Sequence, residues 1–164
     1  MEIWTTLAMQ AVALAFAVTG GMFLAFSDFI MRALGATPGA GGLAAMQEIN
    51  RAVFRWVFMT LFLGLVPVSL LLLGLGLWAV GGTPGGLMAV AGLVYLAGVF
   101  GVTAARNVPM NTALDRFAAQ SAEGAAYWRE TYLPKWTGWN SVRAVASILS
   151  SGLMLAAGAA LSAG

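Results

Sequence analysis

Long apolar stretches alternate along the chain with two segments that hold nearly all of its charge. All eight Lys and Arg residues lie within residues 32–55 and 106–143, and five of the six acids lie in or beside the same segments. An α-helix needs roughly 20 apolar residues to cross a bilayer. The pattern therefore predicts four membrane-spanning helices in a single domain, residues 1–164. The helices are expected over about residues 4–34, 54–80, 87–105 and 139–161.

Shorter elements are predicted between these spans. The run Thr37–Gly42 breaks the first helix, and a short helix follows that has Asn50 on one face and Arg51 on another. Ser121 is expected to cap a further helical piece, which Pro134 ends. The predicted fold is all-α. It is a four-helix transmembrane bundle with a short amphipathic helix before the second span and a partly helical loop between spans three and four.

The positions of the cations predict the orientation of the bundle. Loops rich in Lys and Arg stay on the cytoplasmic side of a membrane. We therefore expect the charged loops to be cytoplasmic and both termini to lie outside, in an inner or plasma membrane. Tryptophan marks membrane interfaces. We assign Trp4 and Trp78 to the outer interface. We assign Trp56, Trp128, Trp136 and Trp139 to the inner interface.

Composition excludes several classes of function. Hydrophobic residues make up 60% of the chain and charged residues 9%, which indicates a lipid bilayer as its surroundings. The net charge is only +2, and the sequence has no run of Lys or Arg that would bind nucleic acid. The chain has no Cys and no His, so disulfides, thiolate nucleophiles, His-ligated haem and the usual catalytic triads are excluded. We predict no cofactor and no metal site.

Small residues recur every four positions in the last two spans, a pattern that lets helices approach closely in lipid. The two stripes are Ala97, Gly101 and Ala105, and Gly152, Ala156 and Ala160. They are explained either by packing within one bundle or by a homodimer interface, and the sequence leaves both open.

Polar side chains gather near the charged end of every span. They are Ser27, Asp28, Gln47, Asn50, Asn107, Asn111, Trp136, Trp139, Asn140 and Arg143. One interpretation is structural: amides cap and bridge helices, and Arg143 pairs with Asp28 or reaches the surface. The other is a ligand pocket, because amides and a guanidinium suit a carbonyl or enolate oxygen and tryptophan suits a flat ring. Burying a polar side chain in a membrane costs free energy, so a cluster of such residues favours a functional role.

Four blocks of the chain, in order, resemble the family of four-span membrane proteins related to anthrone oxygenases. The blocks are residues 21–34, 45–50, 95–111 and 128–143, the last with Trp-Asn-Ser-Val-Arg at its end. The resemblance implies an integral membrane protein and, for some members, oxygenation of an anthrone to an anthraquinone. The family often has histidine where this chain has Ser141, and serine cannot replace a base that titrates near neutrality.

Two functions follow as hypotheses. The first is a cofactor-independent oxygenase for a flat, lipophilic phenol or ketone. Its catalytic residues are expected to be Asp28 as the base and Asn140 and Arg143 as partners of the substrate oxygen. Its ligand contacts are expected from Ser27, Gln47, Asn50, Asn107, Asn111, Trp136 and Trp139. The second hypothesis is a membrane protein without catalysis that binds a lipid, a quinone or a protein partner.

Overall fold

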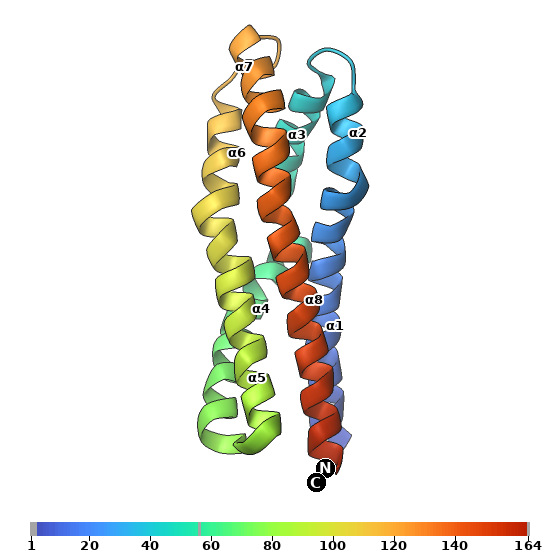
Figure 1. Ribbon diagram of the computed structural model, residues 1–164, viewed down its shortest axis with the longest axis vertical. Helices are drawn as coiled ribbons and strands as arrows, with labels where there is room; N and C mark the ends of the chain where they lie inside the picture. The colour runs from blue at the N-terminus through green and yellow to red at the C-terminus, as the bar shows by residue number, and fades with distance from the viewer. Residues whose placement is uncertain (1–2, 56, 164) are drawn as a thin grey trace.

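The computed structural model describes residues 3–55 and 57–163, and within them the only regular structure is helical (Figure 1). The predicted all-α bundle is confirmed: four helical rods are long and apolar enough to cross a membrane. The rods are Ile3–Ala36, Val57–Val80, Gly82–Asp115 and Ala122–Ala163. The predicted interfacial position of Trp56 lies outside the described residues.

Each rod is built from α-helices that continue through wider π-helical turns. The α-helices are α1 (Ile3–Ala25), α2 (Met31–Ala36), α3 (Gly41–Ala52), α4 (Val57–Leu75), α5 (Gly82–Tyr95), α6 (Val108–Asp115), α7 (Ala122–Ala126) and α8 (Leu133–Ala163). The π-helical turns are Phe26–Ile30, Gly76–Val80, Leu96–Gly101, Thr103–Asn107 and Tyr127–Tyr132. The predicted amphipathic helix before the second span is α3.

Besides Pro67, which lies inside α4, two further prolines lie inside rods without ending them. Pro109 and Pro134 each follow a π-helical turn by two residues, after Asn107 and Tyr132. A π-helical turn shifts the hydrogen-bond register, which leaves room for a residue that has no N–H group. The prediction that Pro134 ends a helix is therefore wrong. The last two rods run past their predicted limits, and the loop between them is short, residues 116–121.

Ser121 caps the fourth rod as predicted. Its hydroxyl oxygen accepts a hydrogen bond from the backbone N–H of Gly124 at 3.0 Å. The backbone of Ser121 is extended, as at a helix N-cap. The turn between the last two rods is thus specified locally by the sequence.

One of the four helix positions in the bundle is filled by two helices, α3 and α4, with a break between them near mid-height. α8 packs along α1 and α5, and α4 packs along α5. In Figure 1, α3 occupies the upper part of the remaining position and α4 the lower part. α3 ends at Ala52, residues 53–55 form a turn and a bend, and α4 begins at Val57. This break interrupts the wall of the bundle at mid-height.

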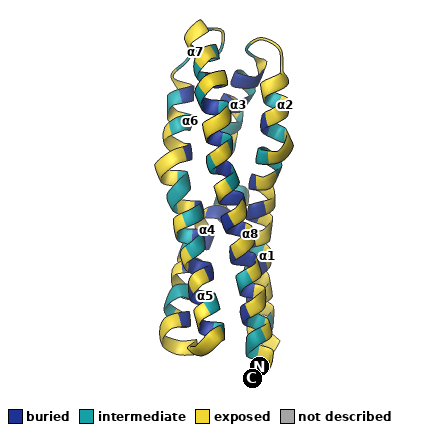
Figure 2. Ribbon diagram, viewed as in Figure 1, coloured by how far each residue is buried: buried dark blue, intermediate teal, exposed yellow. Residues whose placement is uncertain are grey.

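The outer faces of the rods are apolar, as expected for contact with lipid. Figure 2 shows exposed positions along the outside of the rods and buried positions between them. Leu14 is 64% exposed, Leu70 56% and Val145 65%. Exposed aliphatic side chains on three different rods are typical of helices that face acyl chains. The interior is filled by buried side chains such as Phe16, Tyr95 and Met154.

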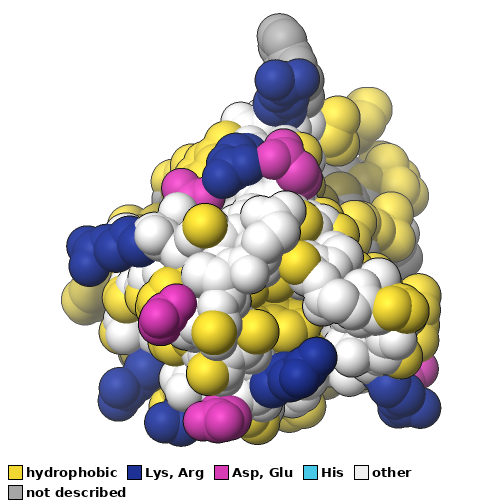
Figure 3. Space-filling view, turned by 90° about the horizontal axis from the view of Figure 1, so that it is seen from above, with side chains coloured by type: hydrophobic (Ala, Val, Ile, Leu, Met, Phe, Trp, Pro, Cys, Tyr) yellow, Lys and Arg dark blue, Asp and Glu magenta, His cyan; other side chains and the backbone are white. Residues whose placement is uncertain are grey.

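The two ends of the bundle differ in charge. Both chain ends lie at the bottom of Figure 1, whereas the loops at residues 37–40 and 116–121 lie at the top. Seen from above, Lys, Arg, Asp and Glu side chains lie around this upper end (Figure 3). At 1.5 Å per residue, a rod of 34 residues spans about 50 Å, more than the roughly 30 Å of a bilayer core. The charged end therefore extends beyond the hydrocarbon layer.

A close contact between the second and third rods depends on a glycine outside the two predicted stripes. A Cβ added at Gly92 would lie 2.3 Å from the carbonyl oxygen of Ser69, so α4 and α5 touch backbone to backbone. By contrast, a Cβ at Gly152 has nothing within 4 Å, and Gly152 is exposed. Packing inside the bundle therefore does not explain the presence of Gly152. A homodimer through the stripes stays a prediction.

Candidate functional site

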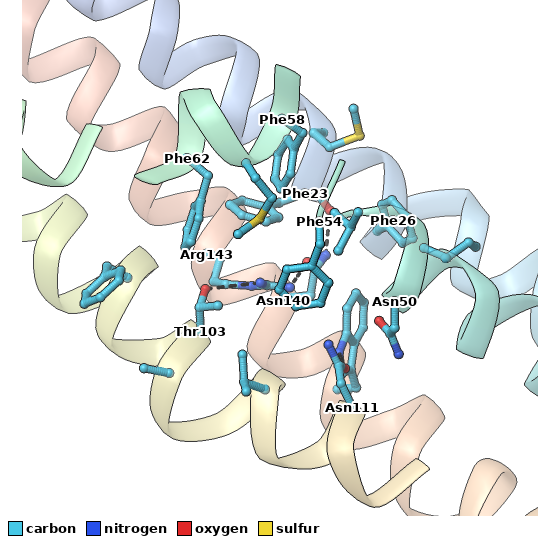
Figure 4. A pocket seen from close by; sticks show the side chains of 18 of the residues that line it. Phe23, Phe26, Asn50, Phe54, Phe58, Phe62, Thr103, Asn111, Asn140 and Arg143 are labelled. Carbon is cyan, nitrogen blue, oxygen red and sulfur yellow. Dashed lines mark hydrogen bonds between the residues drawn. The ribbon is translucent and has the colours of Figure 1, made fainter. Parts of the chain in front are cut away.

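A cavity of about 330 Å³ lies at the level of the break between α3 and α4. Its walls are mainly aromatic and aliphatic and come from α3 and from all four rods. The aromatic rings are those of Phe23, Phe26, Phe54, Phe58, Phe62, Phe100 and Trp136. The polar side chains are those of Asn50, Thr103, Asn111, Asn140 and Arg143 (Figure 4). A mostly apolar cavity with a few polar groups is the usual form of a small-molecule site.

Arg143 lies at one end of the cavity and is only 6% exposed. One guanidinium nitrogen donates to Oδ1 of Asn140 at 2.6 Å, and another donates to Oγ1 of Thr103 at 3.2 Å. The guanidinium carbon lies 4.3 Å from the ring centroid of Phe23 and 5.3 Å from that of Trp136. The third nitrogen, Nε, has no hydrogen-bond partner among the described residues. The rings and neutral groups hold the cation in place but leave its charge unbalanced.

No carboxylate in the described part of the chain forms an ion pair with Arg143. The pairs found there join Arg32 to Asp28, and Arg51 to both Glu48 and Asp115. Removing a charge from water without an opposite charge is costly. A site that retains such a cation is suited to an anion or to an oxygen that gains negative charge.

The structure does not bring Asp28 into the cavity, so its predicted place beside Arg143 is wrong. Its side chain is 68% exposed and lies 3.7 Å from Arg32. Successive residues of a helix point in directions roughly 100° apart. Ser27 faces α8, and Asp28 is therefore turned outward. A base at the cavity cannot come from Asp28 in this arrangement.

Asn140 is fully buried, and its orientation is fixed by two acceptors. Its Nδ2 donates to the carbonyl oxygen of Phe23 and to Oγ of Ser27, both at 2.6 Å. This orientation directs Oδ1 toward Arg143. Ser141 lies 3.0 Å from Ser27, Oγ to Oγ, but does not line the cavity. Ser27 and Asn140 thus join α8 to the first rod and position Arg143.

Gln47 and Asn107 make structural contacts and do not line the cavity. Nε2 of Gln47 donates to the carbonyl oxygens of Leu114 at 3.0 Å and Phe117 at 2.9 Å, at the end of α6. Nδ2 of Asn107 donates to the carbonyl oxygen of Trp136 at 3.3 Å. These contacts match the structural interpretation of amides at helix ends.

Trp139 also lies away from the cavity. It is half-buried, and the guanidinium carbon of Arg106 lies 4.9 Å from its ring centroid. Trp136 lies one turn earlier and faces the cavity. The expected pair of stacking tryptophans is therefore reduced to one at this site.

A second polar group lies at the other end of the cavity. Oδ1 of Asn111 accepts hydrogen bonds from Tyr132 Oη and Trp136 Nε1, both at 2.7 Å. Nδ2 of Asn50 donates to Tyr132 Oη at 3.3 Å. The rings of Trp128, Tyr132 and Trp136 form a stacked row, with centroids 5.5 and 5.8 Å apart. This row holds the amides of Asn50 and Asn111 in fixed positions.

Sequence reasoning missed Tyr132, Thr103 and the phenylalanine wall. A signal was present for Tyr132, because Trp128, Tyr132 and Trp136 recur every four residues. Phe58 and Phe62 have the same spacing. No comparable signal identified Thr103 among the other small polar residues of the spans.

Arg51 ties α3 to α6 above the cavity. Its guanidinium donates to Asp115 at 2.5 Å and also bonds to Glu48 on its own helix. The hydrogen bond to Asp115, with the charges of Asp115 and Glu48, raises the pKa of Arg51 above its ordinary value. Arg51 is charged at any physiological pH, so these contacts change little with pH.

The comparison with protein families agrees with the resemblance described above. A family model described as anthrone oxygenase matches residues 58–153, more than half of the chain. The match includes Thr103, Asn111, Trp136, Asn140 and Arg143. Neither a curated protein nor a solved structure matches the chain. The chain belongs to the anthrone oxygenase family.

Proposed function

We propose that the protein binds a flat, lipophilic aromatic ketone or phenol in this cavity and oxygenates it. The observation that carries the proposal is Arg143, a buried guanidinium with a free Nε and no ion pair with a carboxylate of the described residues. Membership of the anthrone oxygenase family supports a ketone of the anthrone type as the substrate.

The walls of the cavity fit a flat ring system. Phenylalanine rings offer faces and edges for stacking. Phe54 lines the cavity and is also 70% exposed, so the cavity reaches the surface at the break before α4. A lipophilic ligand can therefore enter at the depth at which it dissolves in the bilayer. Its oxygen then meets the guanidinium of Arg143.

The proposed reaction needs molecular oxygen and no metal. An anthrone loses one proton from its methylene carbon, and the electron pair of the broken C–H bond is delocalised onto the carbonyl oxygen. Arg143 stabilises this enolate through charge and hydrogen bonding. The carbon then bonds to oxygen, which gives a hydroperoxide once the terminal oxygen is protonated. Loss of water from the hydroperoxide leaves a second carbonyl group, so one anthrone and one O₂ give one quinone and one water.

The proton of the methylene group is assigned to water or hydroxide and not to a side chain. Asp28 is turned outward, and the sequence has no histidine. None of the described residues that line the cavity carries a carboxylate. The contribution of the protein is then to hold the ring and to stabilise the enolate oxygen, which lowers the barrier to proton loss.

Quinone formation tests this proposal directly. Purified protein in detergent is mixed with anthrone in air-saturated buffer, and the absorbance of the quinone is followed. We expect a rate above that of buffer with the same detergent, and a dependence on dissolved oxygen. Folded protein that gives no rate above buffer would remove oxygenation of this substrate class.

Binding without catalysis is the second candidate function. The observation in its favour is the lack of a carboxylate among the described residues of the cavity wall. A quinone or another aromatic anion would occupy the same cavity without being changed. Native mass spectrometry of gently extracted protein distinguishes the two, because a bound molecule that is never turned over supports binding alone.

We also propose that the charged end of the bundle faces the cytoplasm, on the positive-inside rule. The chain has no cysteine, so single cysteines report orientation without background. Thr83→Cys lies at the turn near the chain ends, and Ala119→Cys lies in the loop at the charged end. An impermeant maleimide added to intact cells should label Thr83→Cys and not Ala119→Cys. The reverse pattern would contradict the orientation and leave the cavity unaffected.

A further inference from the structure

The hydrogen bonds of Asn111 fix which of its atoms faces the cavity. Its Oδ1 accepts from two donors, Tyr132 Oη and Trp136 Nε1, each at 2.7 Å. The amide cannot be turned around without placing its NH₂ group against both donors. Nδ2 of Asn111 therefore points away from them and has no hydrogen-bond partner among the described residues. Since Asn111 lines the cavity, its two N–H donors are available to a ligand.

Asn50 is oriented by the same network. Tyr132 uses its single O–H proton on Asn111, so its oxygen accepts the hydrogen bond from Nδ2 of Asn50 at 3.3 Å. Oδ1 of Asn50 is left without a partner in the described part of the chain. Asn50 thus offers an acceptor and Asn111 offers donors in the same cavity, and Figure 4 shows the two side chains close together.

This pair lies opposite Arg143 across the indole of Trp136. The guanidinium carbon is 5.3 Å from the indole centroid, whereas the indole N–H donates to Asn111. In Figure 4 the contact of Arg143 with Thr103 lies on one side of the cavity, and Asn50 and Asn111 lie on the other. The two polar groups therefore lie at different places on the cavity wall, and each contacts the indole of Trp136.

We propose that Asn50 and Asn111 form a second polar subsite, which binds a hydroxyl group on the edge of the ligand farthest from Arg143. The hydroxyl accepts a hydrogen bond from Nδ2 of Asn111 and donates one to Oδ1 of Asn50. The site then selects flat aromatics with an oxygen at both edges over those with an oxygen at one edge. This inference rests on the proposed function, since it requires that the cavity holds an aromatic ligand.

Two simple probes test the subsite in the full chain purified in detergent. 2-Naphthol has one oxygen, and naphthalene-2,6-diol has one at each edge. Titration calorimetry should give a dissociation constant roughly tenfold lower for the diol, after correction for its two equivalent ends. Asn111→Leu removes the donors and Asn50→Ala removes the acceptor. Each should lower this ratio to below about threefold.

Thr112→Ala is the matched control, because Thr112 follows Asn111 on α6 but is exposed and bonds to Val108 of its own helix. It should keep the full ratio. Equal affinities for the two probes in wild-type protein, or a ratio that survives both substitutions, would overturn the subsite and leave cavity binding intact. Failure of both probes to bind would instead remove the proposed function, and the subsite with it. If Asn111→Leu does not fold, Asn50→Ala decides, since Asn50 loses only one bond of 3.3 Å.

Discussion

Arg143→Met is expected to abolish most of the activity while the bundle stays folded. Quinone formation should fall by about 10²–10³-fold, because the donor that stabilises the enolate oxygen is lost. The stability of the bundle should change by no more than about 1 kcal/mol, since loss of an unbalanced buried charge offsets the two hydrogen bonds to Asn140 and Thr103. Activity and thermal unfolding are measured on the same preparation.

Arg106→Met is the matched control for Arg143→Met. Arg106 also packs its guanidinium on a tryptophan, but it is exposed and does not line the cavity. It should keep the wild-type rate. Parallel loss of activity and stability in Arg143→Met would support a purely structural role for the arginine. An active Arg143→Met would remove it from the mechanism.

Gly92→Ala is expected to cause a large loss of stability for a single added methyl group. The new Cβ would lie 2.3 Å from the carbonyl oxygen of Ser69, which is backbone and cannot rotate away. α4 must then separate from α5, and overpacking of this kind costs about 1–3 kcal/mol or more. The melting temperature in detergent should fall clearly, or the protein should fail to accumulate as a folded species.

Gly152→Ala provides the comparison, because its Cβ would meet nothing within 4 Å. Within one bundle this change should be neutral or slightly stabilising, since alanine favours the helix. Cross-linking in membranes reads out the predicted homodimer at the same time. A weaker cross-linked dimer in Gly152→Ala would support the stripe as an interface. A stable Gly92→Ala with unchanged melting temperature would contradict the close contact of α4 with α5.

The architecture could be predicted because it depends on composition over long segments. Apolar runs of sufficient length and two charged segments determine the number of spans and the end at which the charge gathers. The cap at Ser121 was equally predictable, since it needs only neighbouring residues. The lengths of the last two rods were not, because Pro109 and Pro134 each follow a π-helical turn through which the helix continues, and such turns have no reliable signature in the sequence.

The site was predictable in part for a related reason. Asn111, Trp136, Asn140 and Arg143 share the cavity because helical spacing puts polar residues on inward faces. Asp28 was misplaced because its position at the end of a span indicates how deep it lies in the membrane, but not the direction in which its side chain points around the helix axis. The side chains of Gln47 and Asn107 went to backbone carbonyls nearby, which a pattern of residue types cannot distinguish from a ligand contact. The cavity itself follows from the break after α3, which only the folded chain reveals.

The ionisation of a bound phenol tests the role of Arg143 most directly. A buried cation without a paired carboxylate should favour the anionic form of a ligand that lies against it. At a pH at which free 2-naphthol is mostly neutral, the absorption spectrum of 2-naphthol bound to wild-type protein should contain the naphtholate band. With Arg143→Met the band should be absent. A neutral spectrum for the wild-type complex, or the same naphtholate band in Arg143→Met, would contradict an anion-binding cavity centred on this guanidinium.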